Sequence, residues 1–322
     1  MKINCKGKFA SDKISCYRAA KALIEGGLVV LPTETVYGLA ADAENSEAVA
    51  RIYEVKGRPS NHPVIVHIGS IEYLTKWAVD IPNYAYLVAE KFWPGPLTLI
   101  LNREKIAKDF ITGGQDTVAI RIPNHPTAIE ILNTFHTLGG NGVVAPSANR
   151  FGAVSPTTSY AASSELGQLL DFTRDMIIDG GQSIIGIEST IVDCTGLFPE
   201  ILRPGAITEN MIAVASRLKT NFGNKTKKRV PGLHNKHYSP MAEILINGEL
   251  NPGDGFIAMS YIPTPAGGLR LMSPKTLEEF ARMIYAALSE ADFIGISRII
   301  VIPPEGDGLA IAIRDRLTRA AG

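Results

Sequence analysis

The sequence is poor in cysteine and in net charge, and each shortage excludes a class of protein. Three cysteines occur in 322 residues, at Cys5, Cys16 and Cys194, and their odd number and spacing fit neither a zinc site nor a disulfide framework. We expect free thiols in a reducing compartment. Basic and acidic residues balance at 32 each, which counts against broad nucleic-acid binding, because such proteins often carry a basic excess.

Long hydrophobic runs and several common catalytic motifs are also absent. No apolar stretch approaches the roughly 20 residues that cross a bilayer, and the N-terminal segment is too polar for a signal peptide. We therefore expect a cytoplasmic protein without membrane contact. No GxxxxGK(S/T), HExxH, DxDxDG or GxGxxG pattern occurs, which counts against a P-loop enzyme, a zinc protease, an EF-hand and a dehydrogenase.

The sequence instead alternates between helical and extended patterns, which favours an α/β fold. Helical spacing of apolar residues predicts helices over 13–25, 46–56, 126–135 and 208–218, with Ser46 as an N-cap. Short apolar runs predict strands over 28–32, 64–68, 97–101, 118–122, 142–145, 176–179 and 190–194. Some strand pairs should be antiparallel, because several connections between strands are too short for a helix.

The length predicts two domains, at roughly 100–200 residues for each. Residues 1–218 form the first, and residues 241–322 form a smaller α/β unit with its own strand and helix patterns. Between them, residues 219–240 are polar, basic and nearly free of aliphatic side chains. A structureless segment of this length is usually a linker or a functional loop. It is either a passive tether or a lid that closes over a site through His237 and Tyr238.

Polar clusters interrupt the apolar segments of the first domain. Thr35 belongs to a polar run after a predicted strand, and it either holds a small polar ligand or caps a turn. Lys56 and Arg58 stand where a predicted helix ends. They either clamp phosphates, with Arg58 bonding bidentately, or stabilise the helix C-terminus.

Two predicted strands carry a cation or imidazole among apolar residues. Side chains alternate between the two faces of a strand. His67 therefore lies on the face of its strand that does not carry Val66 and Ile68, and Arg121 lies on the face that does not carry Ile120. If both strands belong to one sheet, His67 and Arg121 line one pocket, where Arg121 would suit a carboxylate. Otherwise both side chains face water.

A last cluster combines several segments that are each weak alone. A buried strand leads to Ser147 and Asn149, and the downstream segments GIESTIVD and ILRPG add Glu188, Ser189 and Arg203. Taken together, the clusters are far more specific than any one of them. The sequence resembles the YrdC-like family, the threonylcarbamoyl-adenylate synthases, in the ordered segments LPTETVYGLAADA, KGRPSNHPVIVHI, FWPGPLTLIL, VAIRIP, APSAN, GIESTIVD and ILRPG.

The resemblance covers roughly residues 14–218, and the remainder is similar to the long, two-domain form of the family. It implies a twisted mixed α/β sheet around a large concave cavity, with a small Rossmann-like C-terminal domain. It also implies condensation of L-threonine, bicarbonate and ATP into threonylcarbamoyl-AMP and pyrophosphate. Partner proteins would then transfer the threonylcarbamoyl group to the adenosine beside the anticodon of certain tRNAs. Mg²⁺ would be held mainly by the ATP phosphates, without a metal site on the protein.

The resemblance also implies roles for individual residues. Threonine would contact Thr35, His67, Arg121 and Ser189. ATP would contact Lys56, Arg58, His62, Thr117, Ser147, Asn149, Arg203 and Tyr238. Lys56, Arg58 and His67 would be catalytic. Many members carry Asn where this sequence has His62, and Asn61 precedes it here, so either side chain is a candidate for that contact.

The resemblance leaves the base that deprotonates threonine open, with His67 and bicarbonate as candidates. Two other functions also stay open. One is RNA binding without catalysis, at most weak and supported by the basic run 225–229. The other is carbamoyl transfer, as in related domains of hydrogenase maturation proteins, although those chains carry zinc-binding cysteines that are lacking here.

Overall fold

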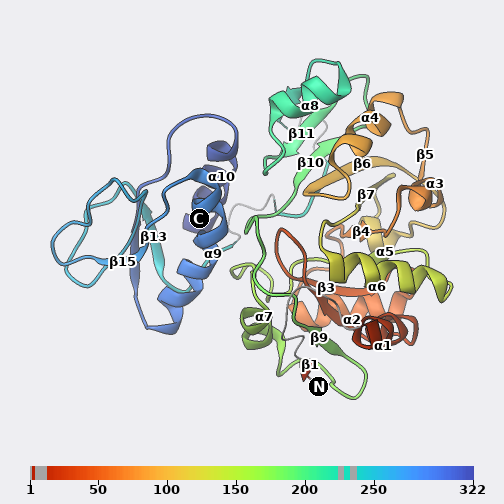
Figure 1. Cartoon of the computed structure of the whole chain (residues 1–322), viewed down its shortest axis with the longest axis horizontal. Coiled ribbons are helices and arrows are strands. Elements are labelled where there is room, and N and C mark those ends of the chain that lie inside the picture. The colour runs from red at the N-terminus through yellow and green to blue at the C-terminus, as the bar shows by residue number, and fades with distance from the viewer. Residues whose placement is uncertain (1, 4–12, 224–227, 233–237) are drawn as a thin grey trace.

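The computed structural model describes residues 2–3, 13–223, 228–232 and 238–322 and forms two α/β domains that lie side by side (Figure 1). The large sheet has the order β1-β9-β2-β3-β8-β4-β7-β6-β10-β11-β12, and β5 pairs with β6. Its strands are β1 (Lys2–Ile3), β2 (Val29–Leu31), β3 (Gly38–Asp42), β4 (Ile65–His67), β5 (Ala78–Val79), β6 (Leu97–Arg103), β7 (Thr117–Arg121), β8 (Val143–Val144), β9 (Met176–Ile178), β10 (Thr190–Asp193), β11 (Glu200–Arg203) and β12 (Asn221–Phe222).

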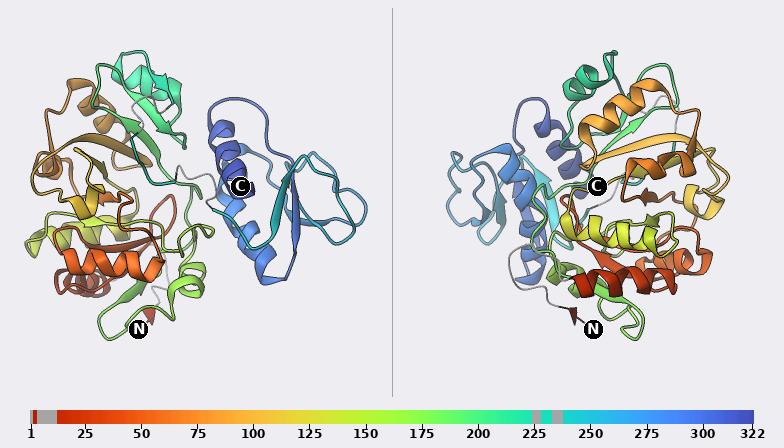
Figure 2. Two further views of the ribbon diagram at one scale, coloured as in Figure 1. Left: turned by 180° about the vertical axis from the view of Figure 1, so that it is seen from behind. Right: turned by 45° about the vertical axis from the view of Figure 1, so that its right-hand side comes forward.

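The sheet is mixed, as the short connections predict. The pairs β2·β3, β3·β8, β4·β8, β6·β7 and β10·β11 are antiparallel, whereas β4·β7 and β6·β10 are parallel. Helices surround it: α1 (Lys13–Ile24), α2 (Ser46–Lys56), η1 (Ile71–Tyr73), α3 (Leu74–Trp77), α4 (Asn83–Phe92), α5 (Asp109–Thr112), α6 (Pro126–Thr137), α7 (Ser159–Leu166) and α8 (Glu209–Ser216). Helices α1 and α6 pack against each other beside the sheet (Figure 2).

The sequence predicts most of these elements but misses several. The N-cap of α2 is Asn45 rather than Ser46, because the Asn45 side chain accepts hydrogen bonds from the backbone of Glu47 at 3.1 Å and of Ala48 at 3.0 Å. Strand β3, of sequence GLAAD, has little intrinsic strand preference and forms because β2 and β8 pair with it on either side. Helices α4 and α7 were also missed.

The predicted alternation along β4 is confirmed. Val64, Val66 and Ile68 pack into the main apolar core. Ile65 lies on the other face, in a smaller apolar cluster that includes Ala119 of β7. The second face therefore carries the polar side chains of the same strands.

The second domain contains a four-stranded parallel sheet of order β13-β16-β14-β15. Its elements are β13 (Glu243–Ile246), β14 (Gly255–Ile257), β15 (Leu269–Met272), α9 (Leu277–Phe293), β16 (Arg298–Val301) and α10 (Leu309–Ala321). Figures 1 and 2 show α9 and α10 between this sheet and the first domain. The small C-terminal α/β domain that the sequence predicts is confirmed.

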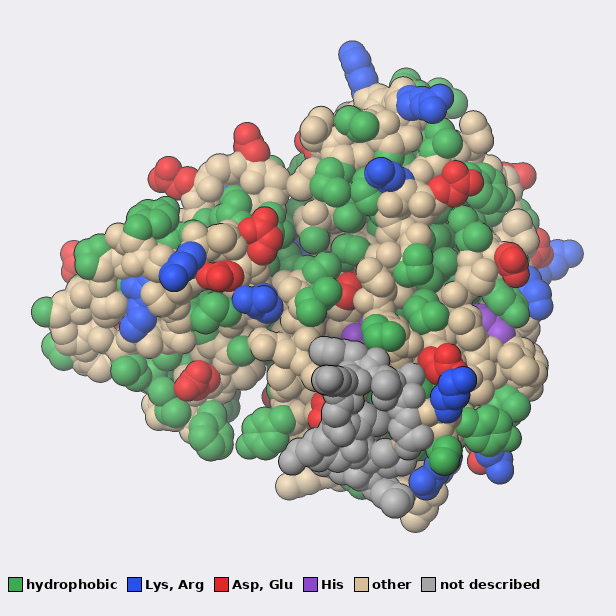
Figure 3. Space-filling model, in the orientation of Figure 1, with side chains coloured by type: hydrophobic (Ala, Val, Ile, Leu, Met, Phe, Trp, Pro, Cys, Tyr) green, Lys and Arg blue, Asp and Glu red, His purple; other side chains and the backbone are tan. Residues whose placement is uncertain are grey.

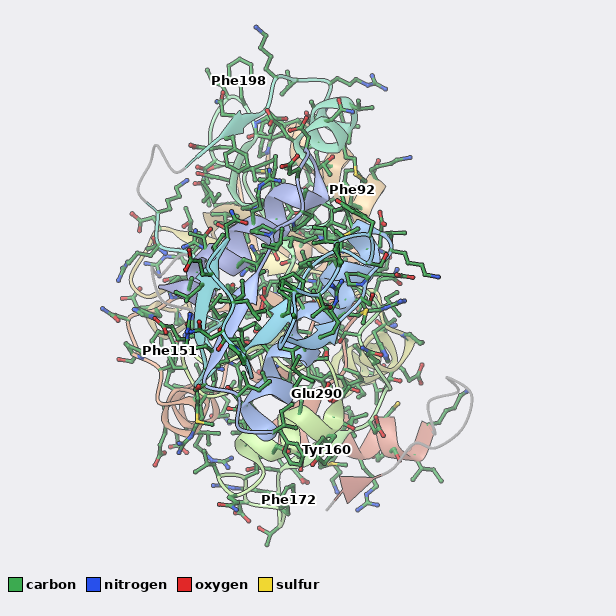
Figure 4. All side chains as sticks on the ribbon, turned by 90° about the vertical axis from the view of Figure 1, so that its left-hand side faces the viewer. Phe92, Phe151, Tyr160, Phe172, Phe198 and Glu290 are labelled. Atoms are coloured by element: carbon green, nitrogen blue, oxygen red, sulfur yellow. The ribbon has the colours of Figure 1, made fainter. Side chains whose placement is uncertain are left out.

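The two domains share an apolar junction. Val36, Val154 and Ile187 of the first domain belong to the same buried cluster as Phe280 and Tyr285 of α9. A groove also runs along the junction, where Tyr160 on α7 and Glu290 on α9 line one cavity (Figure 4). The junction is buried like a core, so α9 and α10 have a fixed place against the first domain.

The remaining features agree with the composition. Cys16 and Cys194 are buried and form no disulfide with each other, and Cys5 lies outside the described residues. On the face seen in Figure 3, Lys and Arg are interspersed with Asp and Glu. Within the described ranges, no helix has the length and apolar character that crossing a membrane requires.

Candidate functional site

The candidate site begins as a row of side chains across the large sheet. His67 of β4 pairs in register with Arg121 of β7, and Arg121 pairs with Thr98 of β6. Ile191 of β10 continues the row, opposite both Thr98 and Arg203 of β11. Because partners in register point to the same face of a sheet, His67 and Arg121 share one cavity, as the alternation predicted.

Most of the predicted site residues line this one cavity. They are Thr35, Lys56, Arg58, His67, Arg121, Ser147, Asn149, Ser189, Arg203 and Tyr238. Thr117 lies at the other end of β7, opposite Asn102, and is not among the lining residues. His62 is also outside the lining, although its ring centroid lies 5.4 Å from that of Phe151, which lines the cavity. Asn61 is exposed.

The linker narrows this cavity. Pro231, Gly232 and Tyr238 line it together with the sheet residues. The enclosed free space is about 50 Å³, whereas pockets for drug-sized ligands usually measure roughly 300–1,000 Å³. The linker segment therefore covers the part of the cavity beside Arg203 in this structure.

Hydroxyl groups and one ion pair form the part of the cavity around Arg121. Thr35 Oγ1 lies 2.9 Å from Thr33 Oγ1, and Ser189 Oγ lies 2.8 Å from Thr98 Oγ1. Arg121 Nη2 lies 2.6 Å from Oε1 of Glu34, and both side chains are buried. The Glu34 carboxylate thus holds the Arg121 guanidinium in place beside the hydroxyls, and a guanidinium with hydroxyl neighbours is suited to a small hydroxylated carboxylate.

His67 is neutral in this setting. Its Nδ1 lies 3.1 Å from the carbonyl oxygen of Ile65, and since a carbonyl only accepts, Nδ1 carries the proton and Nε2 keeps a lone pair. Burial, with the charge of Arg121, lowers the pKa of His67 to about 3. So weak a base is poorly suited to deprotonating an ammonium group, but Nε2 can accept a hydrogen bond from a ligand.

Lys56, Arg58 and Asn149 form the opposite part of the cavity. Lys56 Nζ donates to the carbonyls of Ser147 and Asn149, so it fixes the loop after β8. Burial, followed by the nearby charge of Arg58, holds the pKa of Lys56 well below its usual value. Among the described residues, Nε of Arg58 and Oδ1 of Asn149 are buried without a hydrogen-bond partner. Because both residues line the cavity, these two atoms are available to bind a ligand or a water molecule there.

Arg203 connects the sheet to the linker. Its Nη2 donates to the carbonyl and hydroxyl oxygens of Ser189 at 2.9 and 3.1 Å, and its Nη1 donates to the carbonyl of Pro231 at 3.0 Å. Its guanidinium is therefore committed to protein oxygens. Any contact that Arg203 makes with a nucleotide would share these donors.

Two acidic residues of the site had no predicted role. Glu34 pairs with Arg121, and Glu188 accepts hydrogen bonds from Ser155 at 2.6 Å, Tyr285 at 2.8 Å and Arg316 at 2.8 Å. Both glutamates stand in segments that the sequence marks as polar clusters. The partners of Glu188 on α9 and α10 lie about a hundred residues away, so no local pattern could reveal them.

Comparison with known proteins identifies the family. The family described as Telomere recombination matches residues 21–205, and the family described as Threonylcarbamoyl-AMP synthase, C-terminal domain, matches residues 206–322. The chain is 36% identical to the threonylcarbamoyl-AMP synthase of Pyrococcus abyssi, over 99% of this chain and 97% of the relative. The chain belongs to the threonylcarbamoyl-AMP synthase family. This confirms the resemblance on which the expected site residues rest.

Other threonylcarbamoyl-AMP synthases agree in both sequence and structure. The Bacillus subtilis relative is 37% identical over 95% of this chain and 92% of its own length. The crystal structure of P. abyssi Sua5 complexed with L-threonine matches with a TM-score of 0.85 at 34% identity, and the match covers 96% of this chain and 95% of that one. The two-domain α/β architecture of this chain is therefore that of a threonylcarbamoyl-AMP synthase.

Proposed function

We propose that this member of the threonylcarbamoyl-AMP synthase family is a nucleotidyltransferase that condenses L-threonine, bicarbonate and ATP into threonylcarbamoyl-AMP and pyrophosphate. One observation carries the proposal: a single cavity joins a hydroxyl-rich part beside Arg121 to a cationic part formed by Lys56 and Arg58. The first part suits threonine and the second suits a triphosphate. The product then supplies the threonylcarbamoyl group for adenosine beside the anticodon of tRNA, through separate transfer proteins.

The chemistry needs a free amine and stabilisation of negative charge. The threonine amine adds to bicarbonate with loss of water, and the resulting carbamate oxygen attacks the α-phosphate while pyrophosphate leaves. Since His67 is a weak base at its low pKa, a second bicarbonate or solvent takes the proton of the ammonium group. Arg58 stabilises charge on the phosphates, and Lys56 holds the Ser147–Asn149 loop against the nucleotide.

The cavity fits a Mg²⁺ ion that ATP itself brings. Glu188, which lines the cavity, is already paired with Arg316, and Glu34 beside it is paired with Arg121. Among the described residues, no cluster of acidic, histidine or cysteine side chains is arranged to hold a metal ion. Phosphate oxygens and water would therefore be its main ligands, as is usual for Mg²⁺ in nucleotide enzymes, and the ion would neutralise phosphate charge.

We further propose that the linker acts as a lid. His237 lies outside the described residues, but Tyr238 lines the cavity, and Val230 packs in the apolar cluster beside Ile65. Lys228 bonds to Asp193 at 2.5 Å, and Arg229 donates to the carbonyl of Gly113 at 2.6 Å. These contacts hold the linker against the first domain, as a lid requires, and they engage two cations of the basic run.

Substitution of Gly232 tests the lid. Gly232 has φ +81°, and a Cβ there would lie 2.1 Å from Tyr238 Oη and 3.0 Å from Arg203 Nη1. Gly232→Ala should therefore displace the linker at a cost of about 1–3 kcal/mol, which corresponds to roughly a 5- to 150-fold loss of kcat/KM for ATP. Gly223→Ala is the matched control, because Gly223 also has a positive φ but open space around it. Equal effects of the two substitutions would contradict the lid.

The proposed function is tested by pyrophosphate release from ATP and bicarbonate, with and without L-threonine. We expect release only with threonine, together with a product of the mass of threonylcarbamoyl-AMP. Release with carbamoyl phosphate in place of threonine would instead indicate carbamoyl transfer. If the folded protein instead binds RNA in a salt-dependent manner and does not turn over ATP, the catalytic function is wrong and RNA binding is favoured.

A further inference from the structure

A buried ion pair connects the second domain to the wall of the cavity. Arg316 on α10 has no exposed surface, and its Nε donates to Glu188 Oε2 at 2.8 Å. Its Nη2 also donates to the carbonyl oxygens of Pro204 at 3.0 Å and Glu188 at 3.4 Å. One guanidinium from the second domain thus binds two separate segments of the first.

Those two segments carry residues of the proposed site. Ser189 follows Glu188, and Arg203 precedes Pro204. Ser189 and Arg203 are bonded to each other, and Arg203 also donates to Pro231 of the linker. Arg316 therefore contacts the immediate sequence neighbours of Ser189 and Arg203, the two cavity residues next to the linker.

Aromatic residues from the linker and from α9 complete the surroundings of Arg316. The Tyr238 ring centroid lies 5.5 Å from the Arg316 guanidinium carbon and 5.6 Å from the Tyr285 ring centroid. Tyr285 donates its hydroxyl to Glu188 at 2.8 Å. Tyr238, which lines the cavity, thus packs against the Arg316 guanidinium, and the same guanidinium binds Glu188 in the cavity wall.

We propose that Arg316 is a positioning residue of the synthase, which fixes Glu188 and Pro204 and so holds Ser189 and Arg203 in the geometry that binds threonine and the linker. This inference rests on the proposed function. Burying two charges is expensive, and apolar residues of similar volume often stabilise a fold as well. A planar guanidinium, however, can bind a carboxylate and two carbonyls at fixed angles, which lysine cannot do. The second domain therefore positions residues of the active site through Arg316.

The variant Arg316→Gln tests this role through the threonine kinetics. We expect KM for threonine to rise about 10- to 100-fold, because small displacements of binding groups carry effects of this size. Arg314→Gln is the matched control. Arg314 lies on the same helix, but among the described residues it donates to the carbonyls of Pro304 and Gly306, which belong to the second domain. Its kinetics should match those of the unchanged protein.

A pH profile distinguishes positioning from simple loss of stability. Burial alone would raise the pKa of Glu188, but Arg316, Arg203 and the Ser155 hydroxyl lower it to about 2, so the carboxylate stays ionised. The other groups facing Glu188 are Tyr285 and Tyr238, and Asp315 pairs with Arg316. In Arg316→Gln the pKa of Glu188 should rise towards the assay range.

We therefore expect kcat/KM for threonine in Arg316→Gln to fall as pH rises from 5 to 8, where Glu188 becomes an unpaired buried charge. The unchanged protein should lack this inflection, and adding Glu188→Gln to the variant should remove it. A flat profile together with an unchanged KM would overturn the proposal.

Two further outcomes keep the test interpretable. If Arg316→Gln does not fold, Arg316→Lys decides, because it keeps the charge but not the bridge. A threefold or larger rise in its KM for threonine supports positioning, and an unchanged KM rejects it. If the unchanged protein itself releases no pyrophosphate with threonine, the proposed function fails rather than the role of Arg316.

Discussion

Replacing Arg58 with alanine should lower kcat for threonine-dependent pyrophosphate release by about 10²- to 10³-fold, the usual cost of removing one pre-placed donor from a transition state. Arg58 is buried in the cavity with Nε unpartnered, and its Nη2 is fixed by the carbonyl of Pro63 at 2.7 Å. Burial lowers the pKa of Arg58, but a guanidinium stays charged at neutral pH. The group is thus held in place with one donor still free for phosphate.

The experiment compares steady-state kinetics of three variants with matched thermal unfolding. Arg58→Lys should recover part of the loss, because it keeps the charge but not the fork of donors. Arg103→Ala is the control for loss of a guanidinium outside the cavity, since Arg103 bonds to Asp109 and Thr112. A kcat for Arg58→Ala within twofold of the unchanged protein would rule out the phosphate clamp.

The second large effect concerns Arg121 and Glu34. Arg121→Met should destabilise the fold by about 3–5 kcal/mol, because it leaves the buried Glu34 carboxylate without its partner. It should also abolish saturation by threonine, whose carboxylate loses its cation. Urea unfolding and the threonine dependence of pyrophosphate release measure the two effects separately.

The double variant Glu34→Gln/Arg121→Met separates folding from binding. Removing both charges leaves no unpaired buried ion, so most of the lost stability should return. Threonine binding should stay lost, because the cation is still missing. If the double variant regained threonine binding, Arg121 would serve the fold alone.

Local patterns in the sequence were sufficient for much of the fold and the composition of the site. Alternation along β4 and β7 placed His67 and Arg121 on the face opposite Val66 and Ile120, because side-chain direction in a strand is fixed by the backbone. Helical periodicity likewise placed α2 at residues 46–56, although the choice between Asn45 and Ser46 as N-cap depended on which side chain reached the free amides.

Resemblance to the family supplied the list of site residues, and the structure showed which of them line the cavity. Thr117 and His62 fall outside the cavity lining while Tyr238 lies inside it. Strand β7 is long enough to separate Thr117 from Arg121 at its two ends. The sequence predicted the strand, but it did not show that the Arg121 end of β7 lines the cavity and the Thr117 end does not.

The sequence alone determined the alternation of helices and strands, the division into two domains, and the cations and hydroxyls available for chemistry, because each follows from residues close together in the chain. Only the tertiary structure decided that Glu34 pairs with Arg121 and that Glu188 pairs with Arg316, 128 residues away. A buried charge needs a partner of opposite sign within a few ångströms. Its identity depends on how α9 and α10 pack against the first domain, which no local pattern encodes.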